Sequence, residues 1–89
     1  MKLIYTKAVT KDVKKIKDKR LIDQISKVIN NMKDITEISQ LKSIKKLSGN
    51  PNAYRVRMGN YRLGFYYEKQ TIILGRLLKR NDIYKVFPE

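Results

Sequence analysis

The most regular pattern of hydrophobic and polar positions lies between residues 54 and 68, where apolar and polar side chains alternate on both sides of a Gly59-Asn60 pair. Such alternation is typical of a strand with one buried face. A Gly-Asn pair between two alternating runs is typical of a two-residue hairpin turn, because both residue types tolerate a positive φ. The sequence therefore predicts a β-hairpin in which Met58 lies opposite Tyr61.

The register of this hairpin decides which side chains share a face. Because side chains alternate between the two faces of a sheet, Arg55, Arg57 and Arg62 fall on the same side, which we call the arginine face. Arg57 then lies directly opposite Arg62, and like charges in opposed positions destabilise a strand pair. Tyr66 has the same parity as the arginines. Folding alone gives little reason for this arrangement, whereas an anionic ligand provides one.

The chain before the hairpin predicts one short strand and two helices. Residues 2–5 are apolar enough for a first strand, and Thr6 is the predicted N-cap of the helix that follows. Apolar residues then recur at helical spacing over residues 9–16 and again over residues 21–32. We expect two amphipathic helices, joined by a tight turn, whose apolar stripes cover a sheet.

The other segments complete the predicted order β-α-α-β-β-β. Residues 35–47 predict a short helical turn and loop at the core edge, since apolar side chains recur there about every three residues, and residues 48–52 are rich in turn formers. A tight turn at Lys69-Gln70 leads into residues 71–78, a strand apolar on both faces and therefore central. The sequence predicts one α+β domain over residues 1–89, with an antiparallel-rich four-stranded sheet and the N-terminal helical hairpin on one face.

Composition narrows the possible functions. The 89 residues carry a net charge of +13 and include neither cysteine nor histidine. Disulfide frameworks, thiolate sites, the usual zinc sites and histidine-dependent catalytic triads are thereby excluded. No apolar run approaches the roughly 18 residues of a spanning helix, so we expect a cytoplasmic protein that does not insert in membranes. The charge predicts a polyanionic partner, with a membrane surface as the weaker alternative.

The candidate chemistry uses cations rather than acids. The eight acidic residues are scattered along the chain, so no metal site or cofactor is predicted. Cleavage of RNA by its own 2′-hydroxyl needs only geometry, charge and proton transfer, and preorganised cations stabilise the charge of its transition state. The arginine face supplies such cations. Arg80 and Tyr84 join it if the basic tail, residues 79–89, folds over the hairpin. The alternatives are that Arg80 forms a salt bridge to Asp82 or to the C-terminus, and that Tyr84 is a core anchor.

Three segments together resemble a known family. Residues 46–49, residues 54–62 of the hairpin and residues 79–84 are similar to the RelE/ParE superfamily of bacterial toxin–antitoxin toxins, and the order of elements is similar over the whole chain. The resemblance implies a RelE-like fold. For RelE-like members it implies a ribosome-dependent endoribonuclease, an mRNA interferase that inhibits translation. The implied partners are a cognate antitoxin, mRNA and the ribosome.

The resemblance also implies residue roles. Many relatives have His-Arg where this chain has Lys79-Arg80. The predicted catalytic residues are Arg57, Arg62, Arg80 and Tyr84, and the predicted RNA-binding residues are Arg55 and Lys79. Tyr66 is added to the predicted RNA-binding residues because its parity places it with the arginines. Two alternatives remain open. One is a ParE-like toxin that inhibits DNA gyrase by contact and cleaves nothing, and the other is a relative that binds RNA without cleaving it.

Overall fold

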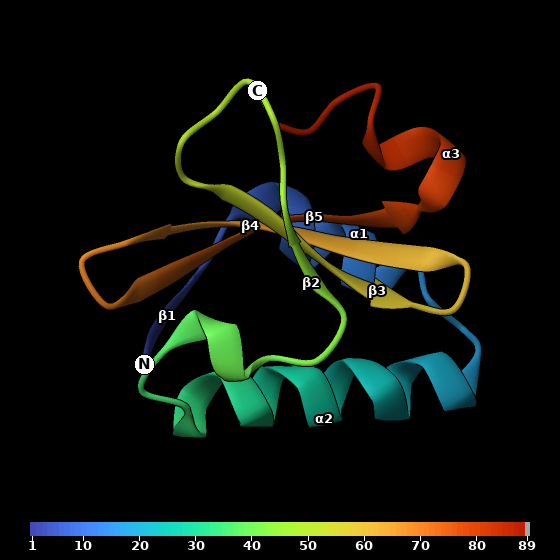
Figure 1. The fold of residues 1–89 in the computed structure, drawn as a ribbon. Helices are drawn as coiled ribbons and strands as arrows, with labels where there is room; N and C mark the ends of the chain where they lie inside the picture. Colours follow the sequence, from blue (N-terminus) through green and yellow to red (C-terminus); the bar gives the residue numbers. More distant parts are fainter. Residues whose placement is uncertain (89) are drawn as a thin grey trace.

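The strands form one sheet in the order β1-β5-β4-β3-β2, in which β1 pairs with β5 in parallel and every other pair is antiparallel (Figure 1). The computed structural model describes residues 1–88, so Glu89, the last residue of the predicted tail, lies outside the described residues. The elements are β1 (Lys2–Tyr5), α1 (Lys7–Lys14), α2 (Lys19–Asp34), the 3₁₀ turn η1 (Ile38–Gln40), β2 (Ile44–Lys46), β3 (Ala53–Met58), β4 (Tyr61–Glu68), β5 (Thr71–Lys79) and α3 (Arg80–Ile83). The predicted α+β class is confirmed.

Side chains cap the start of both long helices. Thr6 Oγ1 accepts a hydrogen bond of 3.1 Å from the Val9 amide, which confirms Thr6 as the N-cap of α1. Asp18 Oδ1 accepts one of 2.9 Å from the Arg20 amide at the start of α2. These oxygens satisfy amides that have no partner within the helix. Each helix therefore begins directly after a polar residue whose side chain caps its first turn.

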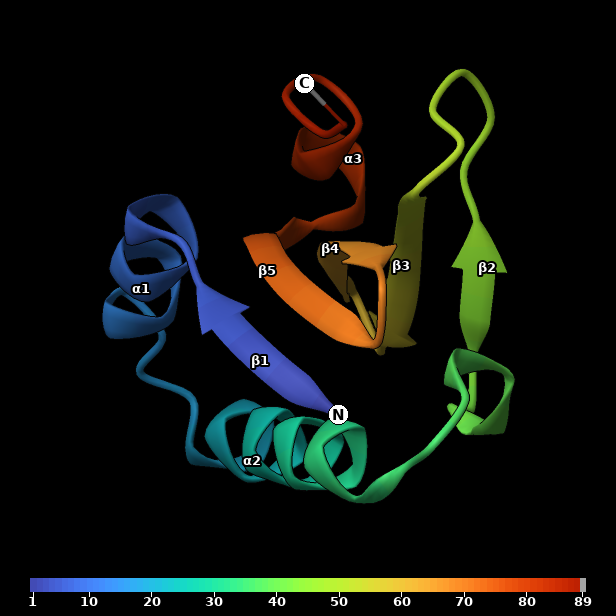
Figure 2. The same cartoon turned by 90° about the vertical axis from the view of Figure 1, so that its left-hand side faces the viewer.

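The main core lies between α2 and the sheet, and α2 runs across one face of it (Figures 1 and 2). Its buried positions Leu21, Ile25 and Met32 follow helical spacing, so they share one stripe of the helix. The sheet contributes its buried side chains from the same face: Val56, Met58, Leu63, Phe65, Ile72, Leu74 and Leu77. The predicted helical cover of one face is confirmed.

Helix α1 packs beside β5 where β1 ends. Pairing of β1 with β5 stops at Leu74, which leaves the rest of that edge open. Thr6 Oγ1 donates to the Leu74 carbonyl at 2.8 Å, and Asp12 Oδ2 accepts from the Leu77 amide at 3.0 Å. Polar side chains of the α1 segment thus satisfy backbone groups that a longer β1 would have paired.

The sheet has a fifth strand, β2, that was not predicted from the sequence. Residues 35–47 were expected as a helical turn and loop, but only η1 is helical there, and β2 pairs with β3. Ser43 has a left-handed φ of 59°, which redirects the chain from the turn into an extended conformation. The apolar spacing of about three residues fits η1, whereas pairing with β3, the next strand along the chain, decides the conformation of β2.

The predicted hairpin register is confirmed at each position. Met58 lies opposite Tyr61, Arg57 opposite Arg62, and Gly64 opposite Arg55. Gly59 has a φ of +59°, whereas Asn60 is not among the residues with positive φ. This is the arrangement of a type II′ turn, which matches the twist of the two strands.

The β4–β5 turn gives a prediction about stability. Lys69 and Gln70 have φ angles of 49° and 61°, so two residues with Cβ atoms occupy the left-handed region. Replacing Gln70 with glycine should raise the free energy of unfolding by about 1 kcal/mol, measured by denaturant titration. The matched control is Asn60→Gly, because Asn60 lacks a positive φ and should gain nothing. Equal effects of the two substitutions would contradict the explanation.

Candidate functional site

The arginine face lies on the side of the sheet away from α2. Val56 and Leu63 point into the α2-side core, so their neighbours in β3 and β4 point the other way. The tail that contains α3 lies over this second face, where Ala53, Ile83 and Phe87 form a smaller buried cluster (Figure 2). The two faces therefore differ in role: one holds the main core and the other presents arginines beside the tail.

Arg62 is the most restrained cation of the arginine face. Its exposed fraction is only 7%. Its Nη1 donates to two backbone carbonyls of the hairpin turn, Gly59 at 2.7 Å and Tyr61 at 3.0 Å. None of the ion pairs formed within residues 1–88 includes Arg62. A nearly buried guanidinium without a carboxylate is costly, so an anionic ligand is the partner this geometry fits.

Arg55 and Arg57 are linked through Ser43, the residue that precedes β2. The Ser43 carbonyl accepts a hydrogen bond from Arg55 Nη1 at 3.0 Å and another from the Arg57 amide at 3.2 Å. Arg55 Nε is buried and has no hydrogen-bond partner among the described residues. The Arg57 side chain is exposed. The Arg55 guanidinium is therefore held at the same carbonyl as the Arg57 backbone, close to the pair formed by Arg57 and Arg62.

The tail folds over the hairpin, which was the condition for Arg80 to join the site. The Arg80 amide donates to the Asn60 carbonyl at 2.8 Å, so α3 begins directly beside the hairpin turn. Phe87 is buried on the sheet at Gly64, where an added Cβ would lie 2.5 Å from the ring. The Tyr66 ring packs against Phe87 with a centroid separation of 5.0 Å. Phe87 thus holds the tail on the face that carries the arginines.

Arg80 and Tyr84 are both available to a ligand. Asp82 pairs with Lys85 at 3.9 Å, so an ion pair between Arg80 and Asp82 is not among those formed within residues 1–88. Arg80 is exposed. Tyr84 is 50% exposed, which excludes the alternative that its ring anchors the core. The ring is therefore free to stack on a base.

Lys79 and Tyr66 take different positions from those expected for a common site. The register places Lys79 opposite Tyr61, whose ring packs on the α2-side core, so Lys79 points away from Arg62. Lys79 lines a shallow groove of roughly 230 Å³ toward α1, together with Lys15. Tyr66 lies on the arginine face, but its ring is engaged with the tail.

Two cations of this face were not predicted. Lys45 lies opposite Arg55 and was missed because β2 was not expected to be a strand. Arg76 lies opposite Gly64, and its Nε and Nη2 donate to the Asp12 carboxylate at 2.8 and 3.1 Å. The sequence did contain a signal for the pairing of Arg76 with an acid: Arg76 is a lone charge in an otherwise apolar segment. A partly buried charge of this kind needs a counter-charge.

The arrangement suits phosphate chemistry. Guanidinium groups donate paired hydrogen bonds that match the geometry of phosphate oxygens. Cations already held in place stabilise negative charge that develops during a reaction. Within residues 1–88, no three acidic side chains gather as a metal site would require. No helix in that range is long and apolar enough to cross a membrane.

Known proteins show similarity over nearly the whole chain. Residues 3–84 match the family model described as ParE toxin of type II toxin-antitoxin system, parDE. The chain is 37% identical over 89 residues to Toxin RelE3 of Methanocaldococcus jannaschii, with 99% of this chain and 100% of that protein aligned.

Solved structures show the same fold. The chain resembles one in the RelB-RelE antitoxin-toxin complex from Methanococcus jannaschii, with a TM-score of 0.81 and 33% identity over 96% of this chain and 99% of that one. The isolated Escherichia coli RelE toxin has a TM-score of 0.65 and 18% identity, over 94% of this chain and 90% of that one. At that level of identity the second similarity concerns the fold alone.

Proposed function

Because the chain belongs to the RelE/ParE family of toxins from type II toxin–antitoxin systems, we propose that it is a ribosome-dependent mRNA endoribonuclease that inhibits translation. The observation that carries this proposal is Arg62, nearly buried beside Arg57 and held by two carbonyls with no carboxylate partner among the described residues. A scissile phosphate is an anion that this pair of arginines fits.

The proposed reaction uses groups of the RNA and of this chain. The 2′-oxygen of the RNA attacks the adjacent phosphorus and loses its proton, while the bond to the 5′-oxygen breaks and that oxygen gains a proton. A 2′,3′-cyclic phosphate and a 5′-hydroxyl result. Arg57 and Arg62 stabilise the extra negative charge on the phosphate. Arg80 contributes from the start of α3, and Tyr84 stacks on a base or assists proton transfer.

A cognate antitoxin is the second proposed partner. The similar structure from Methanococcus jannaschii is a complex of antitoxin and toxin. An antitoxin for this chain would be largely acidic, since the chain carries a net charge of +13, and would order on binding. Co-expression with the neighbouring small gene tests this proposal: a stable complex that restores translation is expected.

Cell-free translation tests the enzymatic proposal. The wild-type protein should stop translation and leave truncated mRNA on the ribosomes, because cleavage takes place on ribosome-bound message. Intact mRNA and undiminished translation in the presence of folded protein would contradict the proposal.

A second candidate is a gyrase inhibitor, which the match to a ParE family model favours. A supercoiling assay separates the two functions. Loss of DNA supercoiling by gyrase, with translation and mRNA unaffected, would replace the ribonuclease proposal with this one.

A further inference from the structure

A second pair of like charges lies on the arginine face. Lys45 in β2 is directly opposite Arg55 in β3, next to the pair formed by Arg57 and Arg62. Lys45 faces away from α2, since its neighbour Ile44 packs on the α2-side core and Leu47 packs with the cluster of Ala53 and Phe87. Lys45 is exposed. The Lys45 side chain therefore belongs to the arginine face.

The two pairs form a continuous track of positive charge. Arg62 in β4 is followed by Arg57 and Arg55 in β3 and then by Lys45 at the open edge of the sheet. Neighbouring strands are about 4.8 Å apart, and alternate residues of one strand are about 7 Å apart. These steps are similar to the separation of consecutive phosphates in a single nucleic-acid strand.

Acids do not offset this charge within residues 1–88. The ion pairs there join Asp12 to Arg76 and Asp82 to Lys85, so none of the four cations of the track has an acidic partner. Each opposed like-charge pair weakens the sheet. A structure that places two such pairs side by side fits a polyanion that crosses both of them.

We propose that Lys45 is a phosphate-binding residue that extends the RNA site from the reacting phosphate to the edge strand β2. This inference rests on the proposed function, since the RNA segment it binds is the continuation of the strand held by Arg57 and Arg62. The flexible ammonium binds a phosphate as a point charge. Contacts of this kind position the strand without reading its sequence.

Lys46 provides a matched control. It is the next residue of β2 and is also exposed, but it lies opposite Tyr54, whose ring stacks on Phe65 in the α2-side core. Lys46 therefore lies on the α2-side face, whereas Arg62 lies on the arginine face. Lys45→Ala and Lys46→Ala remove the same charge from the same strand.

The experiment measures binding of a single-stranded oligoribonucleotide with 2′-O-methyl groups, which cannot be cleaved by its own hydroxyls, over a range of salt concentrations. Lys45→Ala should weaken binding several-fold at low salt and reduce the slope of log K against log salt by about 0.7, the loss of one phosphate contact. Lys46→Ala should change neither value, and Lys45→Arg should restore both.

Several outcomes would overturn the inference: equal losses for Lys45→Ala and Lys46→Ala, no change in the slope for Lys45→Ala, or no measurable binding by the wild type. A loss of affinity confined to an acidic protein partner would also overturn it. The thermal unfolding temperature of Lys45→Ala should equal or slightly exceed that of the wild type, because repulsion between Lys45 and Arg55 is removed. Since the probe is not cleaved, the slope change persists even if the wild type fails to cleave mRNA on ribosomes.

Discussion

Replacing Arg62 with alanine is expected to lower the rate of mRNA cleavage by about 100- to 1000-fold, because the variant loses a preorganised donor to the reacting phosphate. Arg62 is held by the carbonyls of Gly59 and Tyr61, so no reorganisation of its guanidinium is required during the reaction. Single-turnover cleavage on programmed ribosomes gives the rate directly.

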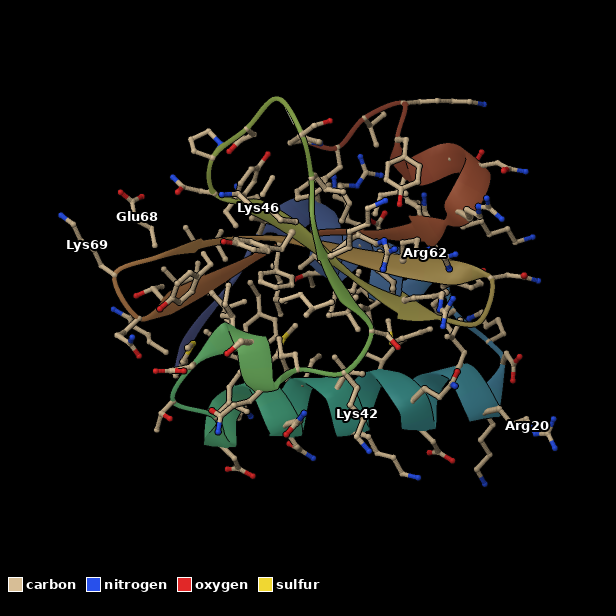
Figure 3. All side chains as sticks on the ribbon, in the orientation of Figure 1. Arg20, Lys42, Lys46, Arg62, Glu68 and Lys69 are labelled. Atoms are coloured by element: carbon tan, nitrogen blue, oxygen red, sulfur yellow. The ribbon has the colours of Figure 1, made fainter. Side chains whose placement is uncertain are left out.

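The control for Arg62 separates chemistry from net charge. Lys69→Ala removes one positive charge at the other end of β4, far from Arg62 (Figure 3). The cleavage rate of Lys69→Ala should stay within a factor of about two or three of the wild-type rate, because the effect of a distant surface charge is screened by salt. The thermal unfolding temperature of Arg62→Ala should stay within a few degrees of the wild-type value. The variant loses two hydrogen bonds, which lowers its stability, but it also loses the repulsion with Arg57, which raises it. Equal cleavage by Arg62→Ala and the wild type would remove Arg62 from the mechanism.

Replacing Phe87 with alanine is expected to lower the free energy of unfolding by about 3 kcal/mol and to reduce cleavage as well. Phe87 is 3% exposed and fills the space above Gly64, where it holds the tail on the sheet. Without the ring, α3 is attached to the sheet mainly through Ile83, so Arg80 is held less firmly beside the hairpin turn. Denaturant unfolding and cleavage assays measure the two effects.

A double-mutant cycle tests whether contact between the ring and the strand is the cause. Gly64→Ala places a methyl group 2.5 Å from the Phe87 ring, so the single substitution should destabilise the protein by about 1–3 kcal/mol. In the Phe87→Ala background the methyl group has room, and Gly64→Ala should cost almost nothing. Additive effects would show that Phe87 does not stabilise the protein through this contact.

Local signals explain why the hairpin was predictable. Alternation and the Gly59-Asn60 pair lie within fifteen residues of chain, and together they determine both the register and the face of each arginine. The N-cap at Thr6 was predictable for the same reason, since its hydrogen bond reaches only to Val9.

Contacts with other segments of the chain explain what was missed. Strand β2 has only three residues, and its conformation depends on pairing with β3, so Lys45 could not be assigned to the arginine face from its own neighbours. The hydrogen bonds of Asp12 with Arg76 join residues 64 positions apart. Docking of Phe87 depends on the bare backbone at Gly64, and a glycine inside a strand signals such close approach without naming what approaches.

The most direct test of the account uses an mRNA with a single 2′-deoxynucleotide at the position where the wild-type protein cuts on the ribosome. If the arginine face promotes attack by the RNA's own 2′-hydroxyl, the wild-type protein cleaves the all-ribose message and leaves a 2′,3′-cyclic phosphate end. The Arg62→Ala variant should cleave the same message much more slowly. The message with the deoxynucleotide should stay intact at that phosphate. Equal cleavage of both messages, or cleavage of neither by folded wild-type protein, would contradict the account.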